Sequence, residues 1–122
     1  LFVLLFFGLI PTGGTIYLQA QAFNNIDIFF KNYSLILISS TAIGTLNTAI
    51  LVINNLRDYS SDKETGKNTL VVFFGREFAC YEYALLLAVN LVSIVVIFVI
   101  TKNFCFALFI LSNTLISYNL II

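Results

Sequence analysis

The sequence predicts an all-α protein, a multi-spanning bundle of transmembrane helices. Hydrophobic residues make up 60% of its 122 residues and charged residues only 10%, whereas water-soluble domains usually carry about 25% charged residues. The mean hydropathy is +1.00. The apolar runs are continuous rather than alternating, so they predict helices and not the strands of a membrane barrel. Composition therefore indicates an integral membrane protein.

Four apolar segments are long enough to cross a hydrocarbon core, which requires about 20 helical residues. We expect residues 1–122 to form a single transmembrane domain, with spans at about Leu1–Gln19, Ser34–Ile53, Tyr83–Ile100 and Phe104–Ile122. The chain begins without Met and ends inside an apolar run. We therefore expect it to be a piece of a longer protein.

The first two spans carry residues that shape helix packing. Pro11 and the glycines around it predict a kink or break near the middle of the first span, a feature that neighbouring helices can compensate. Ser40, Gly44 and Thr48 follow each other at four-residue steps in the second span. They predict a small-residue face on which another helix can approach closely.

The connections between spans differ in charge. Residues 54–82 contain four basic residues, whereas the other two connections contain one lysine each, Lys31 and Lys102. By the positive-inside rule, the 54–82 connection lies on the cytoplasmic side as an Asp-rich loop.

Half of the charged residues of the chain lie within residues 54–70. Asn54, Asp58 and Asp62 are four residues apart, so on a helix they stack along one face. Mg²⁺ is typically held by one or two carboxylates plus waters and phosphate oxygens. This spacing favours shared ligation of a divalent cation by Asp58 and Asp62.

Two further sets of polar residues extend this site. Asn47 lies within about 20° of the direction of Asn54 and Asp58 and about 10 Å deeper in the membrane. It either lines a pocket together with Asn54 or bonds a neighbouring helix, a common role of intramembrane Asn. The cations of the loop can neutralise phosphate oxygens; the candidates for binding a diphosphate are Arg57, Lys63 and Lys67.

A plainer interpretation of the loop is a solvated segment with local salt bridges, which contribute little to stability. Other kinds of site are excluded more firmly. The chain has no histidine, so imidazole metal sites and His-based triads are absent. Cys80 and Cys105 are 25 residues apart in the sequence, which matches no zinc or redox spacing.

The motif N-N-L-R-D-x-x-x-D-x-x-x-G-K-x-T-L begins at Asn54 and is followed by Gly75. It resembles the second Asp-rich motif of the UbiA superfamily of intramembrane prenyltransferases, most closely the branch that prenylates 1,4-dihydroxy-2-naphthoate in menaquinone biosynthesis. The segments F-F-G at residues 6–8 and G-T-I-Y-L-Q at residues 14–19 resemble the same branch less specifically.

The resemblance implies nine helices around a central cavity, of which this chain would supply the fifth to the eighth. It implies that Mg²⁺ binds Asp58 and Asp62, which are the catalytic residues, with Asn54 in a supporting position. It also implies diphosphate contacts from Arg57 and Lys67. The substrates would be a polyprenyl diphosphate and an aromatic acceptor, with the lipid bilayer as surroundings and no role for nucleic acid.

The implied reaction transfers the polyprenyl group to 1,4-dihydroxy-2-naphthoate with loss of CO₂ and gives demethylmenaquinol, which suits a bacterial inner membrane. The first Asp-rich motif of the superfamily is not in these residues, so we expect the chain alone to be inactive. Two alternatives stay open: a prenyltransferase for another aromatic acceptor such as 4-hydroxybenzoate, and a fragment of a membrane transporter. The spans lack charged residues in their interiors, which counts against an ion pathway.

Overall fold

The computed structural model describes residues 2–104 together with Leu108 and Ser112, and these residues form helices and no strands. The predicted all-α fold class is confirmed. In chain order the elements are α1 Phe2–Leu4, η1 Leu5–Leu9, α2 Ile10–Ala22, α3 Ile26–Lys31, α4 Tyr33–Arg57, α5 Tyr59–Glu64, α6 Leu70–Phe74 and α7 Arg76–Thr101.

Three helical runs are long and apolar enough to cross a membrane: Phe2–Ala22, Tyr33–Arg57 and Arg76–Thr101. They correspond to the first three predicted spans. The fourth predicted span, at about Phe104–Ile122, falls almost wholly outside the described residues. Helix α7 starts seven residues before the predicted third span, because its first turns carry charged residues that hydropathy alone places in a loop. The negative charge of Glu77 in the first turn interacts favourably with the positive end of the helix dipole.

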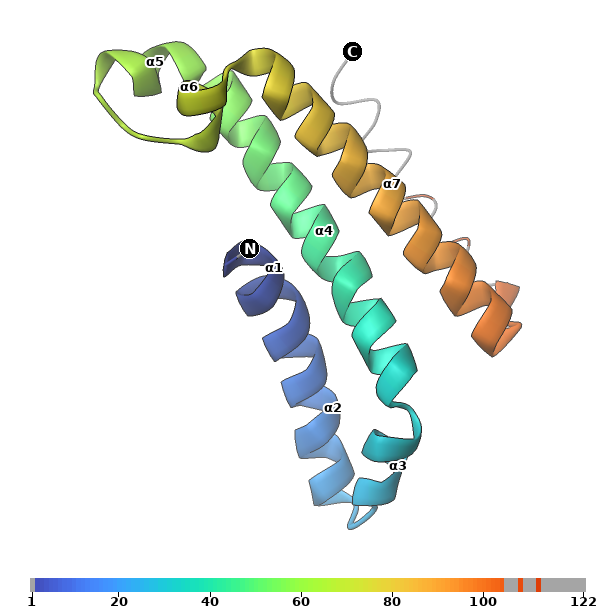
Figure 1. Ribbon diagram of the computed structural model, residues 1–122. Coiled ribbons are helices and arrows are strands. Elements are labelled where there is room, and N and C mark those ends of the chain that lie inside the picture. Colours follow the sequence, from blue (N-terminus) through green and yellow to red (C-terminus); the bar gives the residue numbers. More distant parts are fainter. Residues whose placement is uncertain (1, 105–107, 109–111, 113–122) are drawn as a thin grey trace.

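Helix α4 is the central element of the described structure (Figure 1). It packs against α7 on one side and against α1 and η1 on the other. The loop between α4 and α7, which contains α5 and α6, projects at one end of this helix pair. The side chains of the Asp-rich motif are thus presented at the end of two packed helices.

Helices η1 and α4 cross in close contact. A Cβ atom on Gly8 would stand 2.6 Å from the Ser40 carbonyl oxygen and 2.7 Å from the Cα of Gly44. Only glycine fits at such a distance, because real Cβ atoms do not approach other heavy atoms below 3.0 Å. The predicted small-residue face of the second span is confirmed at these positions.

The predicted irregularity near Pro11 takes the form of a π-helical turn, Leu5–Leu9, in which the Ile10 N–H donates to the Leu5 carbonyl. Proline has no N–H, so Pro11 cannot donate to the carbonyl of Phe7, one turn earlier. The Asn47 side chain of α4 reaches this same carbonyl, with its Nδ2 3.3 Å from the Phe7 oxygen. A neighbouring helix therefore offers the hydrogen bond that Pro11 cannot make.

A hydrophobic core forms where α4, α6 and α7 meet, close to the loop. Its buried members are Ala49, Val52, Val71, Ala79 and Tyr83. Val71 of α6 is only 1% exposed, so this short helix is held by burial of one side chain against the two long helices. Its first turn is capped by Thr69, whose hydroxyl accepts from the Val72 N–H at 3.3 Å.

Deeper in the bundle, Asn90 joins α7 to α4. It is fully buried, and its Nδ2 donates to the Ala42 carbonyl at 2.8 Å and to the Thr45 hydroxyl at 3.5 Å. An intramembrane amide bonded across two helices is a typical polar contact of membrane bundles. Asn90 thus fixes the relative position of the helices that carry the loop.

Candidate functional site

The backbone at the end of α4 continues in helical steps through the Asp-rich motif. The Asp58 N–H donates to the Asn54 carbonyl at 3.0 Å, and the Asp62 N–H donates to the Asp58 carbonyl at 2.8 Å. Asn54, Asp58 and Asp62 therefore follow one another by single turns across the junction between α4 and α5. The short helix α5 keeps the one-turn spacing of the two carboxylates.

Asp58 is paired with its neighbour Arg57. The guanidinium donates twice to the carboxylate, from Nε to Oδ1 at 2.9 Å and from Nη2 to Oδ2 at 3.2 Å. Such a bidentate contact is the strongest arrangement of these two groups. Both side chains are exposed to solvent, at 70% and 44%.

The hydrogen bonds from Arg57 lower the pKa of the Asp58 carboxyl from its ordinary value. Desolvation acts in the opposite direction, and the positive charges of Arg57 and Lys67 add to the lowering. Because the folded pKa is lowered, the stabilisation from this pair is present above the ordinary Asp pKa of about 3.9. It is lost only as the pH falls through the lowered value, so Asp58 is ionised at neutral pH.

Asp62 is buried, with 6% of its surface exposed, and it is paired with Lys67. The Lys67 ammonium lies 3.1 Å and 3.3 Å from the two carboxylate oxygens. A buried carboxylate requires such a partner, because an unpaired charge out of water is costly.

The end of α5 explains how Lys67 reaches Asp62. The Lys67 N–H donates to the Asp62 carbonyl at 2.9 Å, and the Gly66 N–H donates to the Lys63 carbonyl at 3.4 Å. These two bonds form a Schellman motif, in which the residue after the helix adopts a left-handed conformation. Gly66 does so, with a φ of +70°. The Gly-Lys pair of the motif therefore folds the chain back over the buried carboxylate.

The remaining cations of the loop lie against Tyr59. The Lys63 ammonium and the Arg76 guanidinium are each 5.9 Å from the centre of the Tyr59 ring, within the range of cation–π attraction. Neither forms an ion pair within the described part of the chain. These two cations are therefore the ones still available to an anion.

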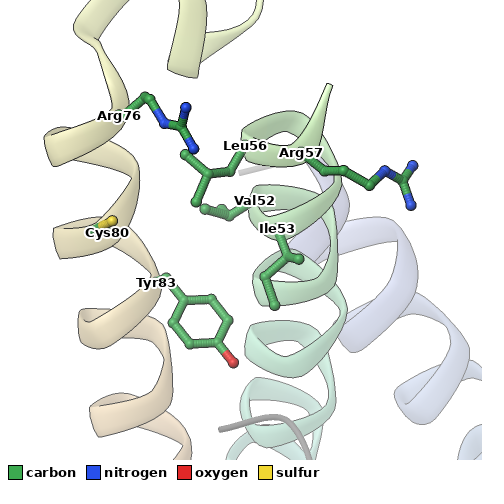
Figure 2. Close-up of a pocket in the computed structure, with 7 residues that line it drawn as sticks. All are labelled: Val52, Ile53, Leu56, Arg57, Arg76, Cys80 and Tyr83. Atoms are coloured by element: carbon green, nitrogen blue, oxygen red, sulfur yellow. The ribbon is translucent and has the colours of Figure 1, made fainter. Parts of the chain in front are cut away.

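Figure 2 shows a pocket of about 260 Å³ between α4 and α7, directly below the loop. Tyr83 points into the space between the two helices, whereas the guanidinium of Arg57 is turned away, toward Asp58. The lining is mostly apolar; it consists of Val52, Ile53, Leu56, Arg57, Arg76, Cys80 and Tyr83.

The two predicted pocket candidates, Asn47 and Asn54, do not line this pocket. Asn47 donates to the Phe7 carbonyl, as described above, and to the Ile43 carbonyl at 3.1 Å. Asn54 is exposed at the end of α4. The structure thus places Asn47 in a contact between helices, and its role in substrate binding stays a prediction.

Three residues around the site were not singled out from the sequence: Tyr59, Arg76 and Tyr83. In the sequence, Arg76 contributes one of the four basic residues of the connection, and its position directly after Gly75 at the start of α7 is a signal that it lies beside the loop. The aromatic rings carry no signal of this kind, because Phe and Tyr occur throughout the chain.

Asp58 and Asp62 are the candidate ligands for Mg²⁺ in the described part of the loop. Carboxylate oxygens suit Mg²⁺, which takes one or two of them and completes its shell with waters and phosphate oxygens. Within the described residues no group of three or more His, Cys, Asp or Glu side chains gathers as a metal site. By their donor atoms the two carboxylates thus fit a Mg²⁺ ion that is shared with a phosphate ligand.

Comparisons with known proteins point to one family and one kind of enzyme. The family model of the UbiA prenyltransferase family matches residues 1–122. The chain is 44% identical over 92 residues to a 1,4-dihydroxy-2-naphthoate octaprenyltransferase of Escherichia coli, which is 75% of this chain and 27% of that protein. It is 37% identical over 100 residues to a protein of the same name from Mycobacterium leprae, which is 82% of this chain and 31% of that protein.

A third relative of the same name, from Haemophilus influenzae, is 44% identical over 73 residues, or 60% of this chain and 21% of that protein. The chain thus matches less than a third of the length of each of these relatives. A comparison with solved structures finds no match.

Proposed function

The chain belongs to the UbiA prenyltransferase family, and from this we propose that the whole protein transfers a polyprenyl group from polyprenyl diphosphate to 1,4-dihydroxy-2-naphthoate. The observation that carries the proposal is the Asp-rich loop, in which carboxylates lie paired with cations at the end of two packed membrane helices. The names of the relatives support the choice of acceptor.

We assign the roles in the site by charge and position. Asp58 and Asp62 would hold Mg²⁺, with Asn54 in support, and the candidates for contacting the diphosphate are Arg57, Lys63 and Lys67. Bound Mg²⁺ would supply Lewis-acid stabilisation of the negative charge that develops on the diphosphate. The cations of the loop add to this stabilisation through charge-assisted hydrogen bonds.

In the reaction, the bond between the allylic carbon and the diphosphate oxygen breaks, and the diphosphate leaves with the electron pair. The electron-rich ring of the acceptor attacks the resulting carbocation, and the ring carboxylate is lost as CO₂. Val52, Leu56 and Tyr83 provide apolar surface beside the loop. Such surface excludes water, which would otherwise capture the cation.

The proposal also places the protein in the membrane. Residues 1–122 would form part of one transmembrane domain, and residues 54–82 its cytoplasmic Asp-rich loop in a bacterial inner membrane. The four basic residues of this connection support that orientation.

The activity is tested on the full-length protein in membranes. A polyprenyl diphosphate is supplied with either 1,4-dihydroxy-2-naphthoate or 4-hydroxybenzoate, with and without Mg²⁺, and products are identified by mass. We expect a Mg²⁺-dependent prenylated naphthoquinol without the carboxyl group. Prenylated hydroxybenzoate alone would reject the acceptor and keep the reaction type. No product from folded protein with either acceptor would reject the proposal.

The metal assignment predicts that Asp58→Ala and Asp62→Ala each lower turnover at least about 100-fold, which corresponds to roughly 2.7 kcal/mol of transition-state stabilisation. Glu64→Ala is the matched control, because Glu64 is an exposed carboxylate of the same short helix without an ion pair within the described residues. A separate thermal unfolding measurement first establishes that each variant is folded, and turnover is then measured on the folded protein. Near-normal turnover in both Asp variants would contradict the assignment.

A further inference from the structure

Each carboxylate proposed to bind Mg²⁺ is already bound to a cation proposed to bind diphosphate. Asp58 holds Arg57, and Asp62 holds Lys67. We propose that these ion pairs are a self-inhibited state of the site, which opens by partner exchange: the diphosphate draws Lys67 and Arg57 away, and the released carboxylates then bind the metal. This inference rests on the proposed function and concerns the order in which the ligands bind.

The Asp62–Lys67 pair has one fixed and one movable partner. The Asp62 side chain is only 8% exposed, whereas the Lys67 side chain is 61% exposed. The backbone of Lys67 is held by its N–H bond to the Asp62 carbonyl, so the ammonium stays within reach of the site. It can swing into solvent without unpacking the loop. When it does, the carboxylate of Asp62 loses the group that covers both of its oxygens.

The Arg57–Asp58 pair is open to exchange for a different reason. Both side chains are exposed, and ion pairs in water contribute little net stability. A diphosphate offers Arg57 the same bidentate geometry with more negative charge. Both cations can therefore leave their carboxylate and bind a phosphate without losing charge-assisted hydrogen bonds.

The exchange makes metal and diphosphate bind cooperatively. A divalent cation that arrives alone has to displace a cation from a carboxylate, so its affinity is reduced. A diphosphate that has removed Lys67 restores the affinity, and by linkage the metal increases the affinity for diphosphate by the same factor. The loop is therefore expected to bind its metal weakly until the prenyl donor is present.

The variant Lys67→Gln distinguishes partner exchange from a purely structural role of Lys67. The probe is Mn²⁺, measured by electron paramagnetic resonance on the full-length protein without diphosphate. We expect Lys67→Gln to bind Mn²⁺ about tenfold more tightly than the wild type, which corresponds to about 1.4 kcal/mol. Lys63→Gln is the matched control: it removes the same charge one residue from Asp62 but breaks no ion pair within the described residues, and a smaller gain is expected. Lys67→Arg should restore weak binding.

The second measurement is the binding of labelled inorganic diphosphate at saturating Mn²⁺. We expect Lys67→Gln to weaken this binding, so the variant changes the two affinities in opposite directions. A merely structural lysine would lower both. The inference is overturned if Lys67→Gln leaves the Mn²⁺ affinity unchanged, lowers it, or raises it no more than Lys63→Gln does.

Failure of this inference is distinguishable from failure of the proposed function. If Lys67→Gln does not tighten Mn²⁺ binding while the wild type still prenylates its acceptor with Mg²⁺, only the partner exchange is wrong. If Asp62→Asn leaves Mn²⁺ binding unchanged both alone and together with Lys67→Gln, the metal assignment is wrong and the partner exchange fails with it.

Discussion

At the scale of single residues, Asn47 shows how a polar side chain in one membrane helix can supply a hydrogen bond that a neighbouring helix lacks. Its amide donates to the carbonyl that Pro11 leaves without the usual helical donor. A hydrogen bond of this kind contributes about 0.5–1.5 kcal/mol net. Asn47 is therefore expected to stabilise the contact between η1 and α4.

This role predicts a coupling between two substitutions. Asn47→Leu should lower the free energy of unfolding of the full-length protein by about 1 kcal/mol. In a Pro11→Ala background the cost should be smaller, because alanine has the backbone N–H that proline lacks. A double-mutant cycle on thermal unfolding measures the coupling. Strictly additive costs would contradict the pairing, and altered substrate kinetics at unchanged stability would support the pocket role.

The sequence showed which residues of the site carry charge but not which of them are paired. The one-turn spacing of Asp58 and Asp62 was readable, because helical periodicity is a local property. The pairing of Asp62 with Lys67 depends on the chain reversal at Gly66. Gly66-Lys67 after a helix is a recognisable capping signal, but the burial of Asp62 depends on tertiary packing, which no local pattern gives.

At the scale of elements, the end of α5 sets the geometry of the site. Gly66 has a φ of +70°, and a Cβ added there would meet no atom within 4 Å. A substitution at this position is therefore strained by the backbone conformation alone, not by crowding.

Gly66→Ala is expected to cost about 1–2 kcal/mol of stability in the loop, the usual cost of a left-handed conformation for a residue with a Cβ. Gly66→Asn should cost less, since Asn tolerates this conformation. Gly13→Ala is the control: it also has open space around it, but it lies in a helix, where alanine is favoured over glycine. Thermal unfolding of the full-length variants measures the stability cost of each substitution and checks this ranking. Equal effects of Gly66→Ala and Gly13→Ala would contradict the capping role.

The long helices were predictable and the short ones were not. Runs of about 20 apolar residues identify the spans by length alone. The first three predicted spans therefore agree with the helices to within a few residues at every end except the start of α7. Helices α5 and α6 have six and five residues and are too short to be stable by themselves. Helix α6 is held by Val71 in the core, a contact that depends on how α4 and α7 pack.

At the scale of the whole molecule, the described spans imply alternate sides for successive connections. In full-length protein without its natural cysteines, Ser61→Cys should react with a membrane-impermeant maleimide only from the cytoplasmic side. Asn25→Cys, in the connection between α2 and α3, should react only from the opposite side. Labelling of intact cells and of inverted vesicles gives the comparison. The reverse pattern would overturn the orientation derived from the basic residues.

The self-paired loop has a consequence for the arrival of an anionic substrate. Residues 57–67 contain three basic and three acidic side chains, so this segment carries no net charge. The field of such a balanced segment falls off much faster with distance than the field of a single charge, and salt screens what is left beyond about 8–10 Å. Long-range electrostatic steering by this segment is therefore weak. Encounter would depend on lateral diffusion in the plane of the bilayer, and the rate at which the donor reaches this loop should vary little with ionic strength.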